Sequence, residues 1–279
     1  MTQTPEKDLP FVEGELTYLV PMSEKPYTYT FDRPGDPKRT NQVFENRKLP
    51  IHDARALPGH LSIDREGFEL LKRPSTVRDF YDEDELRRIY YPETQRIIAE
   101  ATGANRVVVF DHTIRRRLPG VADRTAGQPR QPATHIHNDY TLKSGPQRVR
   151  DVMGDEAETL LKHRFALINL WRPITGPLRD APLAFSDART VADRDFIASE
   201  LIYPDRTGEI FQVVWSPSHR WFYVPEMRPD EALLIKCYDS LTDGTARFSA
   251  HTAFVDPTAP KDILPRESIE IRTIAFYDA

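Results

Sequence analysis

The sequence predicts a mainly β fold with flanking helices (α+β), whose core is a double-stranded β-helix, one form of jelly roll. From residue 165 to the C-terminus, short runs rich in β-branched and aromatic residues alternate with turn residues, and few helical patterns separate them. Such spacing is typical of antiparallel sandwiches and barrels rather than of parallel sheets. A helical segment precedes these runs, so we expect helices that decorate a β core.

The whole chain, residues 1–279, is expected to form a single domain with three segments. The first sixty residues contain eight prolines, which are poorly tolerated in helices and in central strands. We therefore expect residues 1–74 to be a proline-rich N-terminal arm with edge strands. Apolar residues at helical spacings predict a helical segment over 75–104. The strand-rich remainder, 105–279, is the expected jelly-roll catalytic core.

Local signals divide these segments further. In the helical segment Ser75 is a candidate cap, Pro92 should break the segment into two helices, and Gly103 is a natural stop. Two short helices are expected over 144–164. Alternating and β-branched patterns predict strands within 105–117, 165–173, 182–188, 209–217, 220–225, 231–240, 247–254 and 268–277.

Composition narrows the class of protein. The net charge of -5 is mild and no block of Lys and Arg occurs, so we expect neither nucleic acid nor membrane surface as a partner. One cysteine, Cys237, cannot form an internal disulfide, which fits a reducing compartment. The start "MTQTPEKDLP" is unlike a signal peptide, and no apolar run reaches a membrane span of about 18 residues. We expect a cytoplasmic protein; a homodimer formed through the proline-rich arm is compatible with the sequence.

The stretch "THIHNDYT" carries the strongest chemical signal. It places His135, His137 and Asp139 at every second position, so in an extended strand all three side chains point to one face. Three metal-binding side chains on one face are more than a packing core requires. A further ligand must come from elsewhere, and His251 in "FSAHTAFVDP" is the best candidate because it lies in a late strand.

Two histidines and one carboxylate form the facial triad of non-haem Fe(II) oxygenases, which leaves coordination positions open. We therefore predict that His137, Asp139 and His251 bind Fe(II), while His135 lines the substrate site. The open positions would take 2-oxoglutarate and O₂ as co-substrates. Arg272 in "SIEIRTIAFY" is the predicted anchor for the distal carboxylate of 2-oxoglutarate, because a buried guanidinium can grip a carboxylate with two parallel hydrogen bonds.

Two other classes of protein are compatible with the same residues. In a zinc-dependent hydrolase, the His-x-His-x-Asp cluster of residues 135–139 would hold Zn²⁺ and activate water. That zinc motif, however, requires another histidine directly after the aspartate, where this chain has Tyr140. In a non-catalytic β-barrel binding protein, the cluster would be structural.

Several longer segments of the sequence resemble those of a known family. They run from about residue 105 to the C-terminus and include "VVVFDHTIRRR", "HNDYT", "LINLWRPITGPLRDAPLAFSDAR", "WSPSHRWFYVPEMRPDEALLIKCYDS", "AHTAFVDP" and "RESIEIRTIAFY". The resemblance is to the AsaB-, NvfI- and CmcJ-type family of fungal and bacterial non-haem iron, 2-oxoglutarate-dependent hydroxylases and desaturases of secondary metabolism.

The resemblance implies a jelly-roll dioxygenase that uses Fe(II), 2-oxoglutarate and O₂ to oxidise a small molecule. It places the iron ligands on His137, Asp139 and His251 and makes Arg272 the likeliest anchor, with Arg266 and Lys236 as the alternative cations. The matching segment "LINLWRP" suggests three pocket-lining side chains: Asn169, Trp171 and Arg172.

Overall fold

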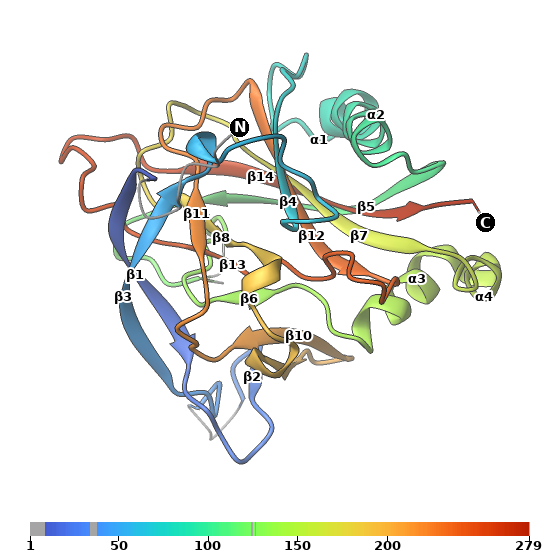
Figure 1. The fold of residues 1–279 in the computed structure, drawn as a ribbon, viewed down its shortest axis with the longest axis horizontal. Helices are drawn as coiled ribbons and strands as arrows, with labels where there is room; N and C mark the ends of the chain where they lie inside the picture. Colours follow the sequence, from blue (N-terminus) through green and yellow to red (C-terminus); the bar gives the residue numbers. More distant parts are fainter. Residues whose placement is uncertain (1–8, 34–37, 124, 126, 279) are drawn as a thin grey trace.

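Two curved β-sheets face each other in the computed structural model, which describes residues 9–33, 38–123, 125 and 127–278 (Figure 1). The larger sheet has nine strands in the order β1 (Phe11–Leu19), β3 (Phe44–Asp53), β11 (Trp221–Tyr223), β8 (Leu183–Ser186), β13 (His251–Ala253), β6 (His137–Asn138), β10 (Thr207–Val213), β9 (Phe196–Ile202) and β2 (Tyr27–Tyr29). The smaller sheet has five, in the order β4 (Phe68–Lys72), β12 (Glu231–Asp239), β7 (Phe165–Pro173), β14 (Glu267–Phe276) and β5 (Arg106–Arg116).

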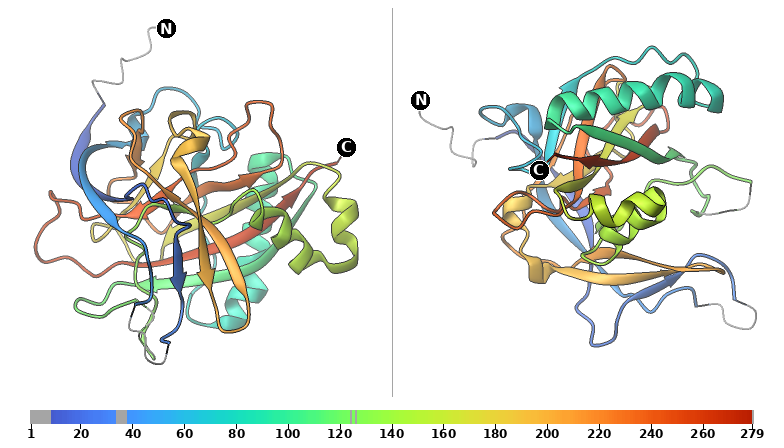
Figure 2. Two further views of the ribbon diagram at one scale, coloured as in Figure 1. Left: turned by 90° about the horizontal axis from the view of Figure 1, so that it is seen from below. Right: turned by 90° about the vertical axis from the view of Figure 1, so that its right-hand side faces the viewer.

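Strand β7 shows why the fold takes this layered form. Every residue of "FALINLWRP" is buried, because the five-stranded sheet is covered on both faces. Leu167 and Trp171 pack in the cluster between the two sheets, whereas Ile168 and Leu170 pack in a second cluster that contains the helical residues Ile97 and Ile98. The helix that contains both isoleucines, α2 (Tyr91–Thr102), therefore covers the outer face of the smaller sheet, as Figure 2 shows in its right-hand view.

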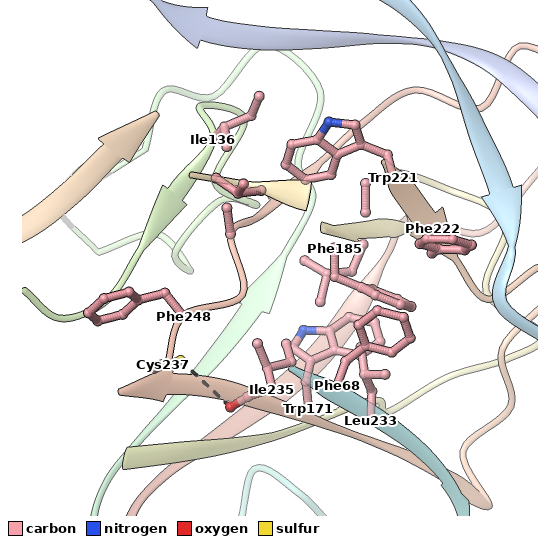
Figure 3. Packing of buried hydrophobic residues seen from close by; sticks show 14 of the residues in the cluster. Phe68, Ile136, Trp171, Phe185, Trp221, Phe222, Leu233, Ile235, Cys237 and Phe248 are labelled. Atoms are coloured by element: carbon pink, nitrogen blue, oxygen red, sulfur yellow. Dashed lines mark hydrogen bonds between the residues drawn. The ribbon is translucent and has the colours of Figure 1, made fainter. Parts of the chain in front are cut away.

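The space between the sheets is filled by large side chains from both of them. Phe68, Trp171 and Ile235 of the five-stranded sheet meet Phe185 and Trp221 of the nine-stranded sheet (Figure 3). The rings of Phe68 and Phe185 lie 4.5 Å apart between centroids, a normal separation for a tilted aromatic pair. This apolar cluster holds the two sheets together at one end of the space between them. Polar side chains occupy the other end. Cys237 belongs to the same cluster, and its thiol is free and buried.

The helical segment differs in detail from the prediction. Helix α1 (Glu83–Glu85) begins at Asp82, whose side chain accepts hydrogen bonds from the backbone N–H groups of Asp84 and Glu85, so Ser75 is not the cap. A π-helical turn, η3 (Leu86–Tyr90), leads into α2 (Tyr91–Thr102). Pro92 lies in the first turn of α2, where its missing N–H is tolerated, and does not break the helix there. Gly103 ends α2 in a left-handed conformation, as predicted.

The remaining helices lie at one end of the two sheets (Figure 1). They are α3 (Ser144–Met153) and α4 (Ala157–Leu160), joined by the short turn η4 (Gly154–Glu156), where two short helices were expected. Further 3-10 turns are η2 (Ala54–Ala56), η5 (Ala188–Thr190) and η6 (Asp193–Asp195). Across the described ranges, no helix is long and apolar enough to span a membrane.

The N-terminal segment contributes more to the sheets than short edge pieces. Strands β1 and β3 pair over nine residue pairs at one edge of the larger sheet, and β2 and β4 lie at edges of the larger and the smaller sheet. Strand β9, which pairs with β10 in a hairpin, was not predicted from the sequence. Its run "FIASELI" has few β-branched residues, so its strand signal is weak.

Gly145 tests how α3 is fixed against the sheet. A Cβ at this position would lie 2.6 Å from Cδ2 of Tyr238 in β12, so Gly145→Ala should force the helix away from the ring. We expect the free energy of unfolding to fall by about 1–3 kcal/mol, the usual effect of overpacking, measured by urea denaturation. The matched variant Gly208→Ala, whose Cβ would meet nothing closer than 3.7 Å, should not be destabilised; equal loss in both variants would contradict this account.

Candidate metal centre and active site

Three predicted ligands meet at the polar end of the space between the sheets. His137 in β6 and His251 in β13 are direct partners in the antiparallel pairing of these two strands. Their ring centroids lie 4.6 Å apart. Asp139 follows β6, and one donor atom from each of the three residues lies within 4.8 Å of the others. Residues that are 112 positions apart in the chain thus form one compact donor set.

Backbone carbonyl groups orient both imidazole rings. Nδ1 of His137 lies 2.9 Å from the carbonyl oxygen of His135, and Nδ1 of His251 lies 3.1 Å from that of Ser249. Since a carbonyl oxygen only accepts, each Nδ1 must carry the proton, which leaves Nε2 with a free lone pair. This is the arrangement by which proteins prepare a histidine for a metal.

The carboxylate of Asp139 is turned so that its two oxygens face different partners. Oδ1 lies 3.7 Å from Nε2 of His137. Oδ2 accepts hydrogen bonds from Nδ2 of Asn169 at 2.8 Å and from Nε of Arg272 at 3.2 Å. Two imidazole nitrogens and one carboxylate oxygen therefore converge, and this donor set suits Fe(II).

Burial and neighbouring charges keep these groups ready to bind a cation. Burial lowers the pKa of His137 to about 3, so its ring is neutral near pH 7. Burial alone would raise the pKa of Asp139, but the positive charge of Arg272 holds that pKa below its usual range. The carboxylate is accordingly ionised.

A cavity of 1070 Å³ opens beside the three ligands. His135, His137, Asp139 and Arg272 all line it, so the alternation predicted for 135–139 does place these side chains toward one space. The ring of His135, however, is stacked on Phe44 with centroids 3.8 Å apart. His135 therefore stands outside the donor set formed by the other two histidines and Asp139.

The other predicted pocket residues of β7 have different surroundings. Asn169 contacts Asp139, and the ring of Trp171 lies 5.0 Å from the guanidinium carbon of Arg266. Arg172 is fully buried on the helix side, where its guanidinium lies over Tyr90 and donates to a backbone carbonyl. The substrate role predicted for Arg172 is therefore corrected to a packing role, because strand alternation turns it away from the cavity.

The predicted anchor cations are also separated in space. Lys236 is fully buried and donates to Asp64 Oδ1 at 2.7 Å and to Asp239 Oδ2 at 2.6 Å. It is not among the cavity-lining residues, so its predicted anchor role is corrected to that of a buried ion pair. Arg266 is also buried; its Nε donates to Ser268 Oγ and its Nη1 to the carbonyl oxygen of Ala181.

Arg115 and Gln212 are cavity residues that the sequence did not predict. Arg115 of β5 lines the cavity and donates through Nη1 to the carbonyl oxygen of Gln131. Gln212 of β10 is the register partner of His137, is 6 % exposed and has a side-chain oxygen without a partner among the described residues. Strand alternation could have placed Arg115, the first arginine of "IRRR", inward, but only the pairing of β10 with β6 brings Gln212 to the ligands.

Fold and site together define a class: a double-stranded β-helix that presents two histidines and one carboxylate is the framework of non-haem iron oxygenases. Comparison with known proteins agrees. The family described as "Oxidoreductase/YMDC permease-like domain" matches residues 16–276. The hydroxylase/desaturase efuI of Hormonema carpetanum is 33% identical over 266 residues, which cover 88% of this chain and 89% of efuI.

Both the sequence and the structure of this chain are similar to those of one further relative. The Fe(II)/2-oxoglutarate-dependent dioxygenase nvfI of Aspergillus novofumigatus is 30% identical over 274 residues, 95% of this chain and 96% of nvfI. A solved structure of the iron and alpha-ketoglutarate-dependent endoperoxidase NvfI superposes with a TM-score of 0.87 at 29% identity, covering 96% of this chain and 99% of that one.

This chain belongs to the family of non-haem Fe(II)/2-oxoglutarate-dependent hydroxylases and desaturases. It is an enzyme whose cofactor is Fe(II) and whose co-substrates are 2-oxoglutarate and O₂. The predicted family and jelly-roll fold are thus confirmed, and the zinc-hydrolase alternative is not favoured.

Alanine variants test which histidines hold the metal. Asp139→Ala and His251→Ala should each remove a ligand and abolish Mn(II) binding in calorimetric titrations, whereas His135→Ala should retain it because that ring is stacked on Phe44. The reverse result, loss in His135→Ala with retention in Asp139→Ala, would support the zinc arrangement of residues 135–139 instead.

Proposed function

We propose that this enzyme hydroxylates or desaturates a small molecule of secondary metabolism, with Fe(II) held by His137, Asp139 and His251. The observation that carries the proposal is the convergence of their donor atoms within 4.8 Å of one another, beside a 1070 Å³ cavity that His137 and Asp139 line. When bound, Fe(II) with 2-oxoglutarate and O₂ supplies the oxidising power to remove hydrogen from an unactivated C–H bond. The chain's own part is to orient both organic molecules and to exclude water.

The cavity is large enough for a substrate beside the co-substrate. Pockets of about 300–1,000 Å³ hold drug-sized ligands, and this one reaches 1070 Å³. Its walls come from α3 and from the β9–β10 hairpin, and they combine charged with apolar side chains. The side-chain oxygen of Gln212, which has no partner in the described ranges, and the ring of His135 support hydrogen bonding and stacking to a substrate with polar groups.

Arg272 is poorly suited to anchor the distal carboxylate of 2-oxoglutarate. Its Nε contacts Asp139, its Nη1 donates to Asp111 and Thr113, and its Nη2 lies 2.7 Å from Glu270. A guanidinium has five N–H groups, so at most one remains. A bidentate grip on another carboxylate would require two.

Arg115, supported by Arg266, fits the anchor role better. No carboxylate among the described residues forms an ion pair with the guanidinium group of either arginine. Burial lowers the pKa of Arg115, and burial together with the charge of Arg115 lowers that of Arg266 to about 9. An anion beside Arg115 would stabilise both cations, and the nearby Thr113 lines the same cavity.

We also propose that the enzyme acts in the cytoplasm. The support is the single free thiol of Cys237, which is buried and fits a reducing compartment. A homodimer is a further proposal that a sedimentation experiment can test directly.

The proposed activity has a direct spectroscopic test. Anaerobic addition of Fe(II) and 2-oxoglutarate should produce the weak visible charge-transfer band of a metal chelate, because the chelate needs the open positions beside the three ligands. Aerobic turnover should then convert 2-oxoglutarate to succinate, faster in the presence of a suitable small metabolite. Absence of the band in metal-loaded protein would argue strongly against the proposal.

The anchor assignment is tested by Arg115→Gln. Loss of a charged hydrogen bond to a carboxylate is worth about 1.5–3 kcal/mol, so the Kd for 2-oxoglutarate at saturating Mn(II) should rise about 10- to 100-fold. Arg116→Gln is the matched control, since Arg116 is the next residue of β5 but is exposed and paired with Glu267. An unchanged Kd in Arg115→Gln would refute the assignment.

A further inference from the structure

Asn169 and Arg272 hold only one oxygen of Asp139. Both donate to Oδ2, at 2.8 Å and 3.2 Å, while Oδ1 is the oxygen 3.7 Å from His137. Asn169 is fully buried, and among the described residues its side chain forms one hydrogen bond, which goes to Asp139. Its other side-chain atom, Oδ1, has no partner among them. Burial of a polar amide is costly, so this placement points to a role at Asp139.

Arg272 is itself fixed from several directions. Nη1 donates to Asp111 Oδ2 and to Thr113 Oγ1, each at 2.9 Å, and Nη2 lies 2.7 Å from Glu270 Oε1. These contacts come from β5 and β14, whereas Asn169 comes from β7, the strand that pairs with β14 on its other side. The guanidinium therefore cannot rotate toward the cavity without leaving carboxylates unpaired.

This arrangement limits how Asp139 can bind a metal. A carboxylate ligand can use one oxygen or two, and the second oxygen would occupy a position that the co-substrates need. For Oδ2 to reach the metal, two buried donors would have to give up their hydrogen bonds, and each loss is unfavourable by about 1–3 kcal/mol. The contacts thus favour binding through Oδ1 alone.

We propose that Arg272 and Asn169 are positioning residues that keep Asp139 a one-oxygen metal ligand, so that three coordination positions stay open. This inference rests on the proposed metal-binding role of His137, Asp139 and His251. It gives Arg272 a function different from the co-substrate anchor that the sequence suggested. The two roles differ in a measurable way, because a positioning residue affects the metal centre even when 2-oxoglutarate is absent.

The test compares Asn169→Ala and Arg272→Lys with the unsubstituted chain, without 2-oxoglutarate. Asn169→Ala removes a donor without changing charge, and Arg272→Lys keeps the charge but removes the planar fork. For both variants we expect Mn(II) affinity to fall about 10- to 100-fold, the usual effect of losing a group that orients a ligand. We also expect the visible spectrum of the Co(II)-substituted protein to show a changed coordination number.

Arg116→Lys is the matched control, because Arg116 lies in the neighbouring strand and is paired with Glu267 on the exposed side; its metal affinity and spectrum should equal those of the unsubstituted chain. Circular dichroism verifies folding, and the two test variants lie in different strands, so either one suffices. Unchanged Mn(II) affinity and Co(II) spectrum in a folded variant would overturn the positioning role. Failure of the unsubstituted chain to bind metal would overturn the proposed function, and this role with it.

Discussion

The pairing of β14 with β7 on one side and β5 on the other is the constraint on which the active site depends. It sets Arg272 opposite both Asn169 and Asp111, and Glu270 opposite both Trp171 and Thr113. Because side chains alternate along a strand, the residues between them face the helices instead. A shift of one residue in this register would move the charged side chains into the apolar layer under α2 and would leave Asp139 without its donors.

The same register explains the balance of charge around the metal centre. The cavity side of the smaller sheet carries three guanidinium groups, those of Arg115, Arg266 and Arg272. Three carboxylates, those of Asp111, Asp139 and Glu270, accompany them. A divalent metal and the dianion of 2-oxoglutarate add no net charge to this set when they bind together. Binding of either one alone leaves buried charge uncompensated, so the two should stabilise each other's binding.

Four arginines in or next to β5, β7 and β14 illustrate how one residue type serves several purposes. Arg272 is paired with three carboxylates, and their charges, led by that of Glu270, raise its pKa although burial acts in the opposite direction. The guanidinium groups of Arg266 and Arg115 have no carboxylate partner within the part of the chain that the structure describes, and their pKa values are lowered. Arg172 points to the opposite face of β7 from the cavity side and packs over Tyr90. Their differences arise from neighbours in space, since in the sequence all four look alike.

The sequence by itself determined the layered β fold and most of the metal centre. Continuous apolar runs such as "FALINLWRP" predict strands buried on both faces, and His-x-Asp spacing places His137 and Asp139 on one side of an extended chain. Gly103 marked the end of α2 because few other residues adopt a left-handed conformation.

Only the tertiary structure decided the role of each cation and the limit on Asp139. These depend on hydrogen bonds among side chains from β5, β7 and β14, and on the approach of β10 and β13 to β6. The reason is physical: strand periodicity fixes the face that a side chain points to, but its partners depend on long-range register. The orientation and charge state of a guanidinium depend on those partners. No local pattern in "RESIEIRT" distinguishes an arginine without carboxylate partners from one that is paired with several.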